Sequence, residues 1–286
     1  MHIPVLLKET IEALNIEKNG NYIDCTMNGG GHTGEILKRN GPEGKVLGIE
    51  IDKEIFEKVK KDERLVAVND SYANLKKIVK ETGFEKAKGV LFDVGMSSYH
   101  VDQSERGFSF NKDEPLSMSY SGEYSAEGIV NEWKEENIET ILKEYGEEKY
   151  ARKIAKKIVE ERKRKRISST FDLIEIIRGA TPGSYHHGQI HFATRTFQAL
   201  RIAVNDELNN LRSALPQALE VLDRGGRLVA ISFHSLEDRI AKEFMKEKEK
   251  SGEIRIITSK PIVPGEEEVK SNPRSRSSKL RAGIKI

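Results

Sequence analysis

A glycine cluster between an acidic residue and a helix start could bind a small ligand. It reads Asp24-Cys25-Thr26-Met27-Asn28-Gly29-Gly30-Gly31-His32-Thr33-Gly34. Glycine lets the backbone approach a ligand closely, and the following helix points the positive end of its dipole at that ligand. Three of the glycines also satisfy the dinucleotide pattern G-x-G-x-x-G. The cluster therefore predicts a nucleotide-like cofactor, and the pattern alone does not identify which one.

Three more residues whose side chains could bind a nucleotide-like cofactor follow other apolar runs. They are Glu50 after residues 46–49, Tyr72 after 65–68, and Asp93 after 90–92. Ligands of open α/β sheets bind at the carboxyl ends of the strands, where an acid roughly twenty residues past the glycines accepts hydrogen bonds from ribose hydroxyls. We expect Glu50 to do this and Tyr72 to stack on adenine. A nicotinamide dinucleotide and S-adenosylmethionine both fit, and Asp24 favours the second because it would repel a pyrophosphate.

Alternating strand and helix signals in the first hundred residues predict a doubly wound, mostly parallel sheet. The alternation stops near Asp93, and residues 113–206 show mainly helical patterns. The α/β pattern then returns, with a buried strand at 228–231 and an edge hairpin of 254–257 with 280–286. We therefore expect a discontinuous α/β domain, residues 1–112 and 207–286, interrupted by an inserted helical domain, residues 113–206. The helices expected in the first part are residues 35–40, 53–61 and 75–82.

Composition limits the class of protein only broadly. The chain has 286 residues, a single cysteine and a net charge of +2, which neither demands nor excludes a nucleic-acid partner. The lone Cys25 fits a reducing cytoplasm, and we see no signal peptide and no apolar run near the ~20 residues of a membrane span. His186-His187 lacks partners at ligand spacing, so we expect no metal.

Five longer blocks carry a family resemblance. They are residues 92–98 (FDVGMSS), 105–110 (ERGFSF), 195–205 (RTFQALRIAVN), 232–239 (SFHSLEDR) and 272–278 (NPRSRSS). With the glycine cluster, they resemble the bacterial family of 16S ribosomal RNA cytosine-N4 methyltransferases called RsmH or MraW. The resemblance runs from His2 to the C-terminus.

The resemblance implies a class I S-adenosylmethionine-dependent methyltransferase fold, Rossmann-like, whose inserted helical domain recognises the substrate. It also implies methylation of the N4 amine of a cytosine in the decoding region of 16S rRNA, in the cytoplasm. The cofactor contacts that it implies are Gly30, Gly31, His32, Glu50, Tyr72, Asp93 and His100. At Glu50, Tyr72 and His100 the family more often has Asp, Phe and Gln.

A cytosine amine is a poor nucleophile, because its nitrogen lone pair is delocalised into the ring, so methyl transfer to it requires activation of the amine. A hydrogen-bond acceptor on the amine concentrates that lone pair and receives the proton. We name Asp93 and His234 as catalytic candidates, with Ser97 and Ser98 on the turn after Asp93 as alternatives. Asp93 could instead contact only the cofactor, and His234 could be a structural histidine.

The base must also leave its stack before its amine can reach the donor. Phe108 and Phe110 could stack on it or belong to the core. Four arginines are candidate phosphate contacts: Arg195, Arg201, Arg274 and Arg276. The basic run 162–166 either adds to these phosphate contacts or is only the solvent-exposed end of a helix.

Three departures from the family pattern keep other functions open. Ser117, Ser119 and Ser121 stand where the family has two acids and an arginine. The alternatives that they leave open are a paralogue that methylates another RNA and a catalytically silent RNA-binding or ribosome-assembly factor. A nicotinamide dehydrogenase is a further alternative, which rests on the glycine pattern. The sequence does not decide between a monomer and a homodimer.

Overall fold

The computed structural model describes residues 4–84 and 86–286, so His2, where the resemblance begins, lies outside the described residues. The chain packs as two compact units. We call residues up to Ser97 together with Leu208–Ile286 the sheet unit, and Ser98–Glu207 the helical unit. The helical unit begins before residue 113, the expected start of the inserted domain. The cause is local: Gly107 N donates to Glu114 Oε2 (2.9 Å) and Met118 N donates to Arg106 O (2.7 Å).

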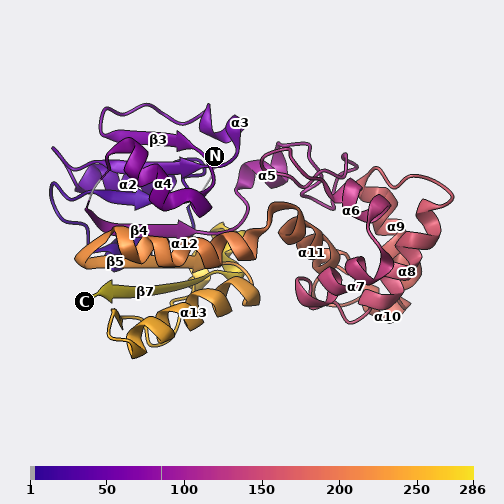
Figure 1. Ribbon diagram of the computed structural model, residues 1–286. Coiled ribbons are helices and arrows are strands. Elements are labelled where there is room, and N and C mark those ends of the chain that lie inside the picture. Colours follow the sequence, from indigo (N-terminus) through magenta and orange to yellow (C-terminus); the bar gives the residue numbers. More distant parts are fainter. Residues whose placement is uncertain (1–3, 85) are drawn as a thin grey trace. The chain divides into compact units, whose positions relative to one another are not determined.

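The sheet unit contains a mixed seven-stranded sheet in the order β3-β2-β1-β4-β5-β7-β6 (Figure 1). Neighbours from β3 through to β5 run parallel, and β7 runs antiparallel to both β5 and β6. The predicted doubly wound, mostly parallel sheet is therefore confirmed, as is the C-terminal edge hairpin. The strands are β1 Tyr22–Asp24, β2 Val46–Glu50, β3 Leu65–Asn69, β4 Ala87–Asp93, β5 Leu222–Ser232, β6 Ile254–Ile256 and β7 Lys279–Lys285.

Each face of this sheet is covered by helices, which explains why the strands read as continuous apolar runs. Ile23 and Leu228 face one core and Tyr22 and Val229 face the other, because successive strand side chains alternate. The first core includes helices α4 Leu75–Thr82, α12 Glu207–Val221 and α13 Ser235–Lys250. The second includes α1 Leu7–Leu14 and α2 Gly31–Arg39.

The shorter elements of the sheet unit mark loops at the strand ends. They are α3 Lys53–Phe56, the 3₁₀ helices η1 Tyr72–Asn74 and η2 Pro273–Ser277, and α14 Glu266–Ser271. The helix expected over 53–61 was wrong in length: it ends at Phe56 and continues only as i→i+3 turns. Residues 57–63 are mostly charged and offer no apolar stripe to bury.

The helical unit is built from α5 Ser98–Asp102, α6 Ala126–Glu132, α7 Glu135–Glu144, α8 Ala151–Arg162, α9 Thr170–Ala180, α10 Gly183–His186 and α11 Thr194–Asn205. Its core consists of apolar side chains at helical spacing, such as Ile138, Leu142, Ile154 and Ile158, all fully buried. Ser169 caps α9, its hydroxyl accepting from Asp172 N. None of the helices in the described chain combines the length and apolar character that a bilayer span requires.

Candidate cofactor site and catalytic groups

The strand register places the glycine cluster, which follows β1, between Glu50 at the end of β2 and Asp93 at the end of β4. Asp24, the last residue of β1, lies opposite Gly48 of β2 and Leu91 of β4. Glu50 and Asp93 therefore extend two residues beyond it on either side. Since β1 lies where the strand order reverses, this is the switch point at which doubly wound sheets bind ligands.

Asp24 holds the glycine cluster together from inside. Its Oδ2 accepts from the Thr33 hydroxyl (2.7 Å) and its Oδ1 from Thr26 N (3.2 Å). Burial raises the pKa of Asp24 to about 6, while the Thr33 and Thr26 hydrogen bonds act in the opposite direction. Both oxygens serve the loop, so the carboxylate shapes the turn rather than facing a ligand. The strand-end pattern predicted the acid but not its partner Thr33, which lies in the first turn of α2.

Glu50 fixes the other side of the loop. Its Oε2 accepts from Asn28 N and its Oε1 from Asp52 N, each at 2.8 Å. Burial raises the pKa of Glu50 to about 7, and the two backbone donors lower it. Asn28 has a positive φ of 48°, a conformation that asparagine tolerates better than most residues. Each carboxylate oxygen keeps a second lone pair for a ribose hydroxyl.

The N-terminus of α2 opens onto free space. Gly30 has a φ of +76° and lies before α2 without any side-chain cap, and a Cβ there would meet no described heavy atom within 4 Å. The first N–H groups of a helix have no intrahelical acceptor. Gly31 is different, because a Cβ at Gly31 would lie 2.9 Å from Pro4 Cγ. The space and the donors together form a cradle at Gly30.

His32 links this cradle to Asp93. His32 Nε2 lies 3.1 Å from Val5 O, and its Nδ1 lies 3.4 Å from Asp93 Oδ2. Burial lowers the pKa of His32 to about 4, so the ring is neutral near pH 7, and the carbonyl of Val5 assigns its proton to Nε2. His32 therefore bridges the N-terminal segment and the end of β4.

Asp93 carries the most informative atom of the site. The residue is buried, and its Oδ1 has no hydrogen-bond partner among the described residues. Burial, and then the nearby charges of Asp24 and Glu237, raise the pKa of Asp93 well above its usual range. An unpaired buried acceptor is costly. The amino group of an adenine or of a cytosine would satisfy it, so the residues fit a nucleoside-bearing ligand.

Two further residues proposed for the cofactor occupy different units. Tyr72 lies in η1 of the sheet unit, edge-to-face with Phe92 at 5.7 Å between ring centroids. His100 lies in α5 of the helical unit, buried between Phe108 (5.0 Å) and Tyr120 (4.7 Å). Their cofactor roles stay predictions.

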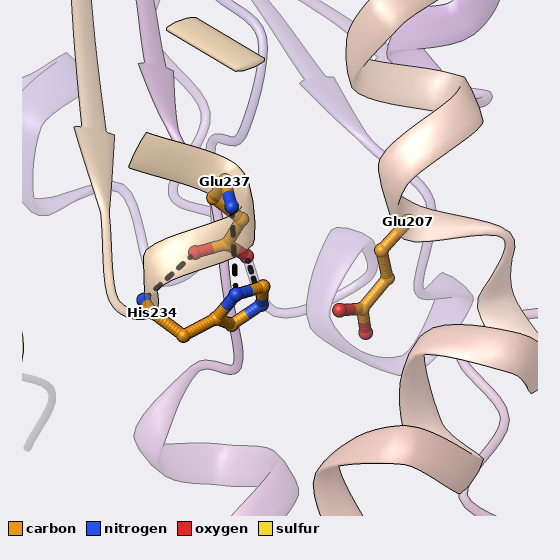
Figure 2. Close-up of side chains that lie close together, drawn as sticks. All are labelled: Glu207, His234 and Glu237. Atoms are coloured by element: carbon orange, nitrogen blue, oxygen red, sulfur yellow. Dashed lines mark hydrogen bonds and ion pairs between the residues drawn. The ribbon is translucent and has the colours of Figure 1, made fainter. Parts of the chain in front are cut away.

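His234 begins α13 and forms a capping box with Glu237 (Figure 2). His234 Nδ1 accepts from Glu237 N at 3.5 Å, and Glu237 Oε2 accepts from Phe233 N at 2.8 Å. His234 Nε2 lies 3.1 Å from Glu237 Oε1 in a geometry too poor for a hydrogen bond. This arrangement assigns the ring a capping role, and its catalytic role stays a prediction.

The four arginines differ in exposure. Arg201 is only 9% exposed, and its Nε and Nη2 each donate to Glu207 at 2.9 Å. Arg201 is thus held in a buried ion pair, and its expected RNA role stays a prediction. Arg274 and Arg276 lie exposed on η2, and half-buried Arg195 donates to the Glu147 carbonyl.

The aromatic candidates and the serine departures have local roles. Phe108 is buried and stacks on Tyr120 at 5.3 Å, as a core residue does. Phe110 stacks on His191 at 4.4 Å. Ser119 is buried, and its hydroxyl accepts from Gly122 N at 2.8 Å, which closes the loop locally without charges.

Comparison with known proteins shows which family and which relatives this chain is similar to. The model of a family described as "MraW methylase family" matches residues 1–286. A ribosomal RNA small subunit methyltransferase H of Clostridium botulinum (strain 657 / Type Ba4) is 46% identical over 306 residues, which cover 100% of this chain and 99% of that protein. The protein of the same name from Clostridioides difficile (strain 630) is 41% identical over 307 residues, with the same coverage. A solved structure described as a putative rRNA-methylase from Clostridium thermocellum aligns with a TM-score of 0.49 at 11% identity, covering 100% of this chain and 98% of that one.

Proposed function

This chain belongs to the MraW methylase family, and from that premise we propose that it methylates the N4 amine of a cytosine in 16S rRNA, using S-adenosylmethionine. The observation that carries the proposal is the match at 41–46% identity over the full length of small-subunit rRNA methyltransferases. Such a match does not favour a dehydrogenase, a paralogue with another RNA or a silent assembly factor. The substrate places the enzyme in the bacterial cytoplasm, where ribosomes assemble.

The cofactor would lie across the carboxyl edge of β1, β2 and β4. The N–H groups at the start of α2 and the open space at Gly30 suit its amino-acid part, and Glu50 suits its ribose hydroxyls. Tyr72, at the end of β3, would contact the adenine. When bound, S-adenosylmethionine supplies a methyl group on a positively charged sulfur, which leaves as a neutral thioether.

Asp93 would then act on the acceptor. Its unpaired Oδ1 accepts an N–H from the cytosine amine, concentrates the nitrogen lone pair and takes the proton as the new N–C bond forms. The positively charged sulfur of the bound cofactor would favour the ionised form of Asp93 and so lower its pKa, against the effect of burial. His32 Nδ1 lies 3.4 Å from the other oxygen, Oδ2, so Oδ1 is the oxygen left for the reacting group. In-line alignment of donor and acceptor supplies the rest, roughly 7–11 kcal/mol in favourable cases.

The direct test uses small ribosomal subunits from cells that lack this gene. Purified protein and methyl-labelled S-adenosylmethionine are added, and the rRNA is digested and analysed by mass spectrometry. We expect one new N4-methylcytidine. Label on another nucleoside, or on another RNA, would overturn the substrate assignment, and an absence of label would overturn the activity.

A further inference from the structure

A basic and aromatic surface surrounds the N-terminus of α8 in the helical unit. Its members are cationic or aromatic side chains from three neighbouring elements, and we call it the α8 patch: Lys149, Tyr150, Arg152, Lys153, Tyr185 and Arg195. The three lysine and arginine residues of 149–153 are exposed, and the two tyrosines and Arg195 are half-buried.

A buried carboxylate hydrogen-bonds both tyrosine residues of the patch. Glu148 is only 3% exposed; its Oε1 accepts from Tyr150 N (2.9 Å) and its Oε2 from the Tyr185 hydroxyl (2.7 Å). The ring centroids of Tyr150 and Tyr185 lie 4.9 Å apart. Burying a carboxylate is costly, and here it fixes the Tyr185 hydroxyl and the backbone of Tyr150, while the two partly exposed rings contact each other. The rings are therefore pre-positioned at the surface.

Cations crowd these rings without acidic partners. Lys149 Nζ lies 5.1 Å from the Tyr150 centroid and 4.8 Å from that of Tyr185, and Lys153 Nζ lies 5.8 Å from that of Tyr150. Within the described part of the chain, no carboxylate lies within 4.0 Å of Lys149, Arg152 or Lys153. One turn later, by contrast, the lysines of α8 do form ion pairs, Lys156 with Glu160 (3.9 Å) and Lys157 with Glu161 (2.8 Å).

The position of these charges on the helix is unfavourable in the isolated protein. The first turn of α8 contains no acidic residue, and Arg152 and Lys153 lie at the positive end of its dipole. Cations are disfavoured there by the helix dipole. Anionic groups from a partner would relieve both this repulsion and the mutual repulsion of the unpaired cations.

We propose that the α8 patch binds an unpaired segment of the rRNA substrate, with phosphates on its lysines and arginines and a base against its tyrosine rings. The inference rests on the proposed function and extends it to a surface of the helical unit. Proteins bind single-stranded nucleic acid by this combination of a basic track and aromatic platforms. An acidic protein segment would match the charges but would leave the two fixed rings unexplained.

The charge test compares two double substitutions in the full-length protein. K149Q/K153Q removes two cations of the patch, and K77Q/K80Q removes two exposed lysines of α4 as a matched control. The probe is a fluorescent oligonucleotide with the sequence of the unpaired decoding-region strand, titrated at several salt concentrations. We expect K149Q/K153Q to weaken binding and to reduce the slope of log K against log salt by about 1.4, since each single-strand phosphate contact contributes about 0.7. The control should keep the affinity and the slope of the unmodified protein.

The stacking test uses Tyr150, whose side chain does not bond Glu148 and can be changed without freeing that carboxylate. Base stacking on an aromatic ring corresponds to at least about a fivefold change in affinity. Y150L should therefore weaken oligonucleotide binding at least about fivefold, and Y150F should stay within about twofold.

Three results would overturn the proposal. They are equal affinity and salt slope for K149Q/K153Q and the unmodified protein, equal loss in Y150L and Y150F, and preferential binding of an acidic peptide at the patch. S-adenosylmethionine affinity, measured in parallel, should not change in any of these variants. If instead the unmodified protein methylates no rRNA at all, the proposed function fails, whatever these variants show.

Discussion

At the scale of single residues, the site depends on buried acids that face the glycine cluster. Strand-end acids are visible in sequence, because apolar runs predict where buried strands end. Their internal partners are not: Thr33 and Asn28 follow from turn geometry that no periodicity reveals. The ion pair of Arg201 with Glu207 could not be predicted for the same reason, since it forms only once the junction of α11 and α12 is folded.

Asp93 gives the sharpest prediction at this scale. D93N keeps the shape of the side chain but cannot take a proton from the cytosine amine. We expect single-turnover methyl transfer to slow by roughly 10²–10⁴, the usual range for a general base. Rapid-quench measurements with saturating labelled cofactor check this. A rate within about threefold of the unmodified enzyme would move the proton acceptor to another group.

Glu50 predicts a pH dependence. Its pKa in the free protein is about 7, above the ordinary 4.5, so the folded state retains a proton and loses stability as pH rises from about 4.5 to 7. Ribose hydroxyls bind the ionised form better, so cofactor binding releases the proton.

We therefore expect cofactor affinity to rise between pH 6 and pH 8 and then to level off. Calorimetry in buffers of different ionisation enthalpy measures both the affinity and the released proton. E50Q should bind more weakly at pH 8 and show a flatter profile. An equally steep profile in E50Q would assign the titration to another group.

At the scale of elements, candidate site residues lie at helix ends, where a side chain can cap the helix, take part in catalysis, or do both. His234 caps α13, a role that asparagine performs at least as well as most residues. H234A should lose about 0.5–2 kcal/mol of stability, whereas H234N should keep the stability of the unmodified protein. Thermal unfolding of the three proteins checks this.

Activity of the same variants separates the two roles of His234. If the ring only caps the helix, H234N keeps full methyl transfer. A large loss of activity in a fully stable H234N would instead make the ring catalytic.

Element boundaries show where sequence patterns are informative. The inner parallel strands were predictable because each contains a continuously apolar run, and α4 was predictable because its stripe at Leu75 and Ile78 is clear. The predicted helix over 53–61 was too long. Its charged residues have good helix propensity, but they provide no apolar face to pack against the core. Periodicity does not locate the start of the helical unit, because hydrogen bonds between 106–107 and 114–118 tie the segment before residue 113 to it.

At the scale of the whole molecule, the alternation of strands and helices predicted a parallel sheet, and the helical stretch predicted a second unit. The strand order was out of reach, because it depends on which strands pair across long loops. The RNA candidates now fall on both units: Arg274 and Arg276 on the sheet unit, and the α8 patch on the helical unit.

This distribution predicts additivity. R274Q/R276Q and K149Q/K153Q should each weaken rRNA binding and lower its salt slope, and the quadruple variant should show the sum of both changes, as independent sites do. Titration of rRNA at several salt concentrations measures all three. A quadruple variant no weaker than K149Q/K153Q would remove Arg274 and Arg276 from the RNA surface.

The pairing of β4 with β5 has a consequence for synthesis. These neighbouring strands are separated in the chain by the whole helical unit, since β4 ends at Asp93 and β5 begins at Leu222. At 5–20 residues per second, the ribosome needs on the order of ten seconds to add that stretch. Throughout that interval the nascent half-sheet exposes β4 as an open edge, a template for mispairing. A chaperone that shields this edge until β5 has been made would therefore raise the yield of folded enzyme.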